Sequence, residues 1–214
     1  MGGGSNPEAS ISIGVPRRWL DLGSGGGLPG LVLAQRWPET EGVLLDASGR
    51  SIRFLASAVE VCGLAPQVRV RRDRAEVAGR DPSFRAGFDA VVARSFGPPA
   101  VVAECAAPLL RPGGVLVVSE PPGGLPSRPD PLDADVGPNP RWPAAELAQL
   151  GLEPVRIVRR GFGYQVLRQV SPCPDRFPRR VGVPAKRPLY RELGDAEGWR
   201  ARVAGSPSPL EGTN

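Results

Sequence analysis

The chain has 214 residues, of which 41% are hydrophobic, so it is long enough for one globular domain with a sizeable core but too short for a second large domain. Its 27 basic and 22 acidic residues give a formal net charge of +5, which favours polyanionic partners. The absence of histidine excludes Ser-His-Asp and Cys-His catalysis, and three cysteines without C-x-x-C spacing indicate neither a metal site nor a disulfide framework.

Short apolar runs alternate with segments of helical periodicity along the first half of the chain. The runs expected as strands are 19–22, 42–45, 68–70, 88–93 and 115–118, and the helical segments are 28–37, 51–62 and 100–110. This alternation predicts an α/β, Rossmann-like fold with a mostly parallel sheet. Farther on, strands at 155–159 and 164–170 around a turn at 161–163 predict an antiparallel C-terminal hairpin at the sheet edge.

The composition changes at both ends of the chain. We expect a short flexible start over residues 1–16, the α/β domain over 17–170, a basic, proline-rich segment over 171–192 and a disordered tail over 193–214. No apolar run reaches the length of a membrane span, and the first residues lack the pattern of a signal peptide. We therefore expect a soluble, cytoplasmic protein.

A glycine-rich loop, "LDLGSGGGLPG", follows the first expected strand. Its last six residues satisfy G-x-G-x-x-G, so a nucleotide-binding oxidoreductase is one interpretation. Asp21 would repel a pyrophosphate, however, and Pro29 removes an amide that phosphates use. S-adenosylmethionine is cationic and has no phosphate, and the spacing D-x-G-x-G from Asp21 to Gly25 is typical of Rossmann-like methyltransferases. A glycine turn that only shortens the crossing from strand to helix is the third interpretation.

Polar residues at the ends of the later strands are further candidates for a ligand site. Asp46 ends the second strand, where a carboxylate can accept hydrogen bonds from ribose hydroxyls, and it could also cap the next helix without losing that role. Ala75 and Glu76 lie within reach of an adenine, and Glu76 is equally explained as a carboxylate at a helix start. Arg94 ends the fourth strand and is expected to point into the crevice of the sheet, unless it pairs with a nearby carboxylate.

Taken together, these motifs resemble the glucose-inhibited division protein B, or RsmG, family of 16S rRNA guanine-N7 methyltransferases. The segments that carry the resemblance are "DLGSGGGLPG", "GRSIRFL", "RAE", "FDAVVARSF", "LLRPGGVLV" and "RFPRRVGVPAKRPL". The resemblance covers the chain from about Arg18 to Leu189. The resemblance implies S-adenosylmethionine bound by Gly23, Leu28, Ala75, Glu76 and Arg94, with 16S rRNA or the small ribosomal subunit as substrate. The cofactor contacts of Asp21, Gly25 and Asp46 are inferred from the residues themselves.

The expected chemistry suits a chain without histidine. Guanine N7 carries a lone pair and no proton, so it can attack a methyl sulfonium directly and needs no general base. Catalysis would come from alignment of the reacting atoms, and no catalytic residue is assigned.

The basic C-terminal segment is a candidate RNA-binding element. We expect Arg179, Arg180, Lys186 and Arg187 to contact the RNA backbone. Phe177 and Tyr190 would then be available to stack on bases. The alternative is a solvated tail whose prolines pack on the sheet.

The chain departs from the family pattern in two places. Only about sixteen residues precede the first expected strand, where family members usually have a helical segment. Glu120 follows the fifth strand, where a lysine-glycine pair is common. We expect Glu120 to weaken contact with RNA phosphate. Both departures favour, as an alternative, a non-catalytic or differently targeted relative that still binds the cofactor. We expect a monomer.

Overall fold

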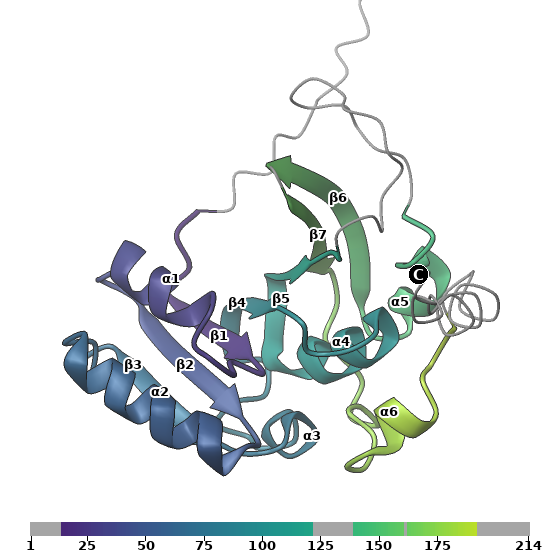
Figure 1. The fold of residues 1–214 in the computed structure, drawn as a ribbon. Helices are drawn as coiled ribbons and strands as arrows, with labels where there is room; N and C mark the ends of the chain where they lie inside the picture. The colour runs from purple at the N-terminus through teal and green to yellow at the C-terminus, as the bar shows by residue number, and fades with distance from the viewer. Residues whose placement is uncertain (1–13, 122–138, 161, 192–214) are drawn as a thin grey trace, which may run out of the picture.

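A seven-stranded sheet forms the centre of the computed structural model, which describes residues 14–121, 139–160 and 162–191 (Figure 1). The strands are β1 (Arg18–Leu22), β2 (Glu41–Asp46), β3 (Val68–Arg72), β4 (Phe88–Ala93), β5 (Leu110–Ser119), β6 (Leu152–Arg160) and β7 (Phe162–Gln169). Their order is β3-β2-β1-β4-β5-β7-β6. The first five strands pair in parallel, and β7 is antiparallel to both β5 and β6, which confirms the predicted fold class and hairpin.

The helices largely follow the predicted segments. They are α1 (Gly30–Arg36), α2 (Gly49–Val61), α3 (Ala75–Ala78), α4 (Pro99–Ala106), the 3-10 turn η1 (Ala107–Leu109), α5 (Ala144–Ala148) and α6 (Val183–Lys186). The helix expected over 100–110 ends at Ala106, because η1 leads directly into β5 at Leu110. Pro112, Gly113 and Gly114 lie within β5, before the predicted strand over 115–118, and a shift in register between β4 and β5 accommodates them. The short helices α3 and α6 were not predicted.

The two faces of the sheet are buried by different elements. Trp19 and Leu44 pack with residues of α1 and α2 on one face. Leu20 and Leu22 pack with residues of α3, α4 and α5 on the other. This division follows from the alternation of side chains along a strand, and it puts Asp21 on the side of Trp19.

The C-terminal segment, residues 171–191, is part of the second face. Cys173, Phe177 and Tyr190 belong to the same core cluster as α4 and are each at most 9% exposed. Figure 1 shows α6 beside the end of α4 and apart from the α1 and α2 side. The segment is therefore packed on the domain.

Some sequence-based expectations concern parts of the chain that are not described. The predicted disordered tail, 193–214, and most of the predicted flexible start lie outside the described residues. Within the described part, no helix has the length and apolar character needed to cross a membrane.

Candidate cofactor site

A cavity of about 440 Å³ opens where β1 to β4 end, at the carboxyl edge of the parallel sheet. Its walls come from the loops after these four strands, from α4 and from α6. Open α/β sheets bind ligands at this edge, and the volume lies within the roughly 300–1,000 Å³ of small-molecule pockets.

Gly23 brings the glycine loop close to one wall of the cavity. Its φ is 73°, a left-handed conformation that L side chains rarely adopt. A Cβ at this position would lie 2.5 Å from Cδ2 of Phe96, which also lines the cavity. The aromatic ring therefore packs directly on the glycine backbone.

The amides of the glycine loop are mostly used within the protein. The N–H groups with internal acceptors are those of Gly23, Ser24, Gly25, Gly27 and Gly30. Their acceptors are the carbonyls of Leu45 and Ser24 and the carboxylates of Asp46 and Asp21. A phosphate site needs several free amides at a helix start, so this loop is poorly suited to a pyrophosphate.

Asp46 joins the end of β2 to the glycine loop. Its Oδ2 accepts a hydrogen bond of 2.8 Å from Gly25 N, and its Oδ1 accepts one of 2.7 Å from Ser48 N. The cap of α2 is Ser48, whose Oγ accepts from Ser51 N. A carboxylate has about four lone-pair sites, so Asp46 keeps capacity for the hydroxyls of a ligand.

Ala75 and Glu76 begin α3 and line the cavity from the end of β3. Glu76 is only 7% exposed. Its Oε1 accepts a hydrogen bond of 2.8 Å from Gly182 N, and its Oε2 lies 3.7 Å from Nε of Arg74. Glu76 is thus both a carboxylate at a helix start and part of the cavity wall.

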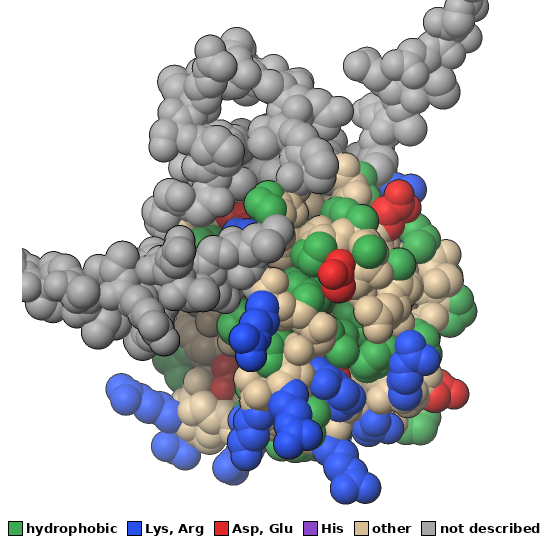
Figure 2. All heavy atoms as spheres, turned by 90° about the vertical axis from the view of Figure 1, so that its right-hand side faces the viewer, with side chains coloured by type: hydrophobic (Ala, Val, Ile, Leu, Met, Phe, Trp, Pro, Cys, Tyr) green, Lys and Arg blue, Asp and Glu red, His purple; other side chains and the backbone are tan. Residues whose placement is uncertain are grey.

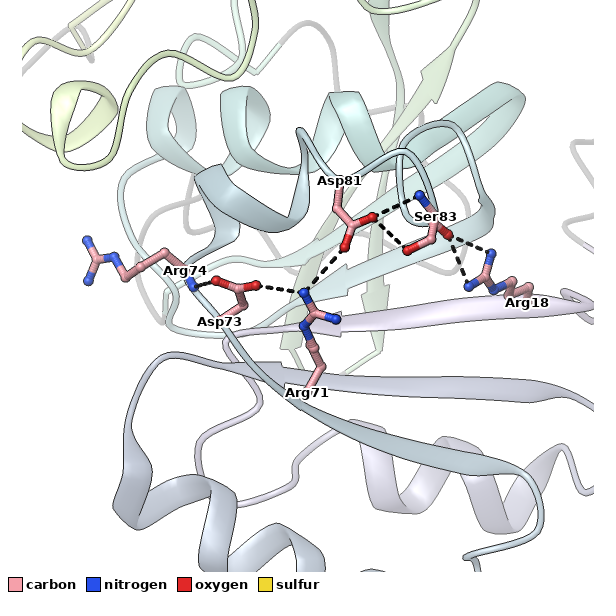
Figure 3. Close-up of polar contacts among 6 residues, drawn as sticks. All are labelled: Arg18, Arg71, Asp73, Arg74, Asp81 and Ser83. Atoms are coloured by element: carbon pink, nitrogen blue, oxygen red, sulfur yellow. Dashed lines mark hydrogen bonds and ion pairs between the residues drawn. The ribbon is translucent and has the colours of Figure 1, made fainter.

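Asp73 fixes the turn that presents this wall (Figure 3). Its Oδ1 accepts from Arg74 N and its Oδ2 from Nη2 of Arg71, both at 2.9 Å. The same Nη2 lies 3.3 Å from Oδ2 of Asp81.

Hydrogen bonds from the Ser83 hydroxyl and amide hold the pKa of Asp81 below its usual value. Figure 3 shows the Arg74 side chain pointing away from this network. Asp73 is not among the predicted site residues, although it directly precedes Arg74, Ala75 and Glu76 in the sequence.

The electrostatic character of the cavity is acidic. Asp46, Asp73 and Glu76 line it together with a single cation, Arg74. A cationic ligand without phosphate is therefore favoured over a dinucleotide.

Asp21 lies beneath the loop and does not line the cavity. It is 1% exposed and faces α1, where its Oδ2 accepts a hydrogen bond of 2.9 Å from Gly30 N. Burial raises the pKa of Asp21 to about 6, and the hydrogen bonds from Gly30 and Ser24 only partly oppose this shift. In this arrangement Asp21 holds the glycine loop through Gly30, and it is not positioned for the direct cofactor contact that the sequence suggested.

Leu28 and Arg94, which the resemblance implied as cofactor contacts, also lie outside the cavity lining. Leu28 is 51% exposed at the tip of the glycine loop. Arg94 is exposed, and its side chain has no hydrogen bond or ion pair with any described residue. Pairing with a carboxylate, the alternative considered for Arg94, is thus not found in the described part of the chain.

Known proteins resemble this chain over most of its length. The family model for rRNA small subunit methyltransferase G matches residues 10–120. A ribosomal RNA small subunit methyltransferase G of Prochlorococcus marinus is 40% identical over 176 residues, which cover 81% of this chain and 68% of the relative. The chain belongs to the rRNA small subunit methyltransferase G family.

A second relative carries the same name, and a solved structure shares the fold. The protein of the same name from Roseiflexus castenholzii is 38% identical over 180 residues, which cover 82% of this chain and 72% of the relative. The crystal structure of the antibiotic-resistance methyltransferase Kmr superposes with a TM-score of 0.55 at 17% identity, covering 72% of this chain and 87% of Kmr. At that identity the likeness concerns the fold alone, which is that of class I methyltransferases.

The family motif "FPRRVGVPAKRPL" is held against the domain more firmly than its composition suggests. Arg179 donates to Glu104, a carboxylate that is 0% exposed, through its backbone N and its guanidinium. Phe177 and Tyr190 are 4% and 9% exposed. These three side chains are engaged inside the protein. The structure therefore gives no support to RNA contact by Arg179 or to base stacking by Phe177 and Tyr190.

Other cations of this motif remain at the surface. Arg180, Lys186 and Arg187 are exposed, and their side chains form no hydrogen bond or ion pair within residues 14–121, 139–160 and 162–191. Figure 2 shows Lys and Arg side chains gathered over the lower part of one face, where acidic side chains are few. These three residues stay candidates for RNA contact.

Glu120, where the family commonly has a lysine-glycine pair, is turned into the protein. It is 6% exposed, forms an ion pair with Arg141 and accepts a hydrogen bond of 2.5 Å from Nε1 of Trp142. The expectation that Glu120 opposes RNA phosphate is therefore not retained, because its charge is buried and paired.

The cavity lining also includes Phe96, Cys105 and Ala185, which are not among the predicted site residues. Phe96 is the last residue of the motif "FDAVVARSF", and no local pattern in the sequence indicates that it packs on Gly23. Cys105 is 1% exposed on α4, and burial raises the pKa of its thiol far above the usual value, so it lines the cavity as a neutral group. Ala185 is distant in sequence, and no local pattern marks it.

Proposed function

We propose that this protein transfers the methyl group of S-adenosylmethionine to N7 of a guanine in 16S rRNA. Its family supports the reaction class, since the relatives named above are small subunit rRNA methyltransferases. The observation that carries the cofactor assignment is an acidic cavity beside a glycine loop whose amides are already engaged. Such a site favours a cationic nucleoside over a dinucleotide.

The lining residues suit the parts of S-adenosylmethionine. Asp46, at the end of β2, can accept from ribose hydroxyls, and Ala75 and Glu76 can flank the adenine. Gly23 and Gly25 leave room for the amino-acid part, whose positive charges the acidic lining favours. When bound, the cofactor supplies an electrophilic methyl group.

The chain's own contribution to the reaction is positioning. Guanine N7 needs no general base, so the protein must align N7 with the methyl group and exclude competing nucleophiles. The acidic lining can also favour the positive charge that passes to the guanine ring. We assign no catalytic proton donor or acceptor.

Exposed cations supply the proposed RNA contacts. Arg94 lies at the end of β4, next to cavity-lining Ser95, and Arg180, Lys186 and Arg187 lie on the C-terminal segment. We propose that they bind phosphates of the rRNA, free or in the assembled subunit, and that the protein acts as a cytoplasmic monomer.

Two structural observations weigh against the alternatives. An oxidoreductase requires pyrophosphate donors, and most amides of the glycine loop are engaged. A non-catalytic relative was favoured partly by Glu120, which is buried and paired with Arg141.

Methyl incorporation tests the proposal. Two reactions are compared, and both contain the protein and methyl-labelled S-adenosylmethionine. One contains small ribosomal subunits that lack methylation, and the other contains large subunits that lack it. Label should enter only small-subunit RNA, and Asp46→Ala should reduce incorporation strongly, whereas Glu60→Ala on the exposed side of α2 should not. Label in both subunits, or in neither, would contradict the proposal.

A further inference from the structure

The C-terminal segment reaches the cofactor cavity through one short helix. Ala185 of α6 lines the cavity, although it lies far from the other lining residues in sequence. Gly182, with φ 78°, starts this helix and donates its N–H to Oε1 of Glu76 at 2.8 Å. The wall around Glu76 and the C-terminal segment therefore meet at the cavity.

Arg85 fastens this segment from outside the cavity. Its Nη1 donates to the carbonyls of Phe177 at 2.8 Å and Gly79 at 3.1 Å, and its Nη2 donates to the carbonyl of Cys173 at 2.8 Å. Gly79 directly follows α3, so a single guanidinium ties the segment to the helix that carries Glu76. Arg85 itself is not a lining residue.

A second attachment holds the segment to α4. Arg179 donates to the buried carboxylate of Glu104, next to Cys105 in the cavity wall. Both helices that border this side of the cavity, α3 and α4, are thus fixed to the C-terminal segment. A change in the seating of the segment must change the shape of the cavity.

We propose that residues 171–191 complete the wall of the cofactor cavity through Ala185, which limits its width, and that Arg85 is a positioning residue that seats this segment. The proposal rests on the proposed function, in which the cavity takes S-adenosylmethionine. Because coupling between two equilibria is reciprocal, cofactor binding must hold the segment in place to the same extent that the seated segment favours binding.

A steric variant tests the wall directly. Ala185→Trp should lower the affinity for S-adenosylhomocysteine, measured by calorimetry, at least tenfold, because the indole occupies ligand space. Val181→Trp is the matched control, since Val181 is 51% exposed in the same segment and does not line the cavity. It should bind like the wild-type protein. Equal affinity of the two variants would overturn the proposal.

Limited trypsin digestion tests the seating. Arg180 and Lys186 are exposed sites in the segment, and cleavage there should slow severalfold when S-adenosylhomocysteine is present. Arg85→Ala should speed cleavage and weaken binding, whereas Arg69→Ala, exposed on β3, should do neither. If the cleavage rate were the same with and without S-adenosylhomocysteine, the predicted stabilisation of the segment by the ligand would be wrong.

The outcomes separate this inference from the proposed function. A wild-type protein that does not bind S-adenosylhomocysteine contradicts the proposed function and removes the basis of the inference. A wild-type protein that binds it, together with unaffected Ala185→Trp and Arg85→Ala variants, contradicts the inference alone. Thermal unfolding without ligand shows whether the Arg85→Ala variant is folded. The Ala185→Trp variant keeps the hydrogen bonds of Arg85, so its result is independent of that control.

Discussion

Arg179 and Glu104 form a two-point ion pair between the C-terminal segment and α4. Oε1 of Glu104 accepts from the backbone N of Arg179 at 2.9 Å and from its Nε at 2.8 Å, while Oε2 accepts from Nη2 at 2.5 Å. The hydrogen bond to Glu104 raises the pKa of Arg179. A residue that the sequence suggests for RNA binding thus neutralises a carboxylate in the core.

Loss of this pair should destabilise the fold. Arg179→Ala leaves the Glu104 carboxylate buried without its cation, so the free energy of unfolding should fall by about 3 kcal/mol. Urea denaturation measures the change. Arg180→Ala is the neighbouring control and should change stability by less than about 0.5 kcal/mol. Equal stability of the two variants would show that the pair contributes little.

The exposed cations should determine RNA affinity and its dependence on salt. Arg180→Ala should weaken binding to small-subunit RNA and reduce the slope of log affinity against log salt by about 1, because one phosphate contact is lost. Filter binding over a salt series gives the slope. Affinity for S-adenosylhomocysteine should stay unchanged, since Arg180 is not a lining residue. An unaltered slope would remove Arg180 from the RNA contact.

The buried carboxyl of Asp21 should produce a pH dependence of stability. Its pKa is raised from 3.8 to about 6, so between these values the native state keeps a proton that the unfolded state has lost. Stability from this group is present at low pH and falls as the pH rises to about 6, by about 3 kcal/mol in total. The stability of the Asp21→Asn variant should not show this decrease with rising pH, because its amide does not titrate.

Denaturant unfolding between about pH 3.5 and about pH 7 measures this difference. The stability of the wild-type protein relative to Asp21→Asn should decline across the interval and then level off. Parallel pH profiles for the two proteins would show that Asp21 titrates normally.

Two glycines of the same loop should respond differently to alanine. A Cβ at Gly30 would lie 2.3 Å from Cδ2 of Leu44 and 2.6 Å from Oδ2 of Asp21, so Gly30→Ala should cost about 1–3 kcal/mol. Gly26→Ala meets no atom within 4 Å and should change stability by less than about 1 kcal/mol. Thermal unfolding compares the variants. A destabilised Gly26 variant with an unaffected Gly30 variant would contradict the packing of the loop.

The order of strands and helices could be predicted because it depends on local periodicity. Apolar runs ending at Leu22 and Ala93 are strands whatever surrounds them, and both appear at the expected places. The end of α4 was misplaced by several residues, since the sequence "APLLRPGG" does not reveal that η1 passes directly into β5.

The cavity was only partly predictable. Asp46 and Glu76 follow strands of a parallel sheet, so topology alone brings them to one edge. Alternation along β1 could have shown that Asp21 shares the face of Trp19 and looks toward α1. The contact of Arg179 with Glu104 joins positions 75 residues apart, and no local pattern distinguishes it from the exposed Arg180.

The position of the transferred methyl group tests the central claim most directly. Small ribosomal subunits without the modification are incubated with the protein and S-adenosylmethionine, the 16S rRNA is digested to nucleosides, and the products are identified by mass spectrometry. We predict 7-methylguanosine, absent when Asp46→Ala replaces the wild-type protein. Confirmed binding of S-adenosylmethionine without any 7-methylguanosine would contradict the claim.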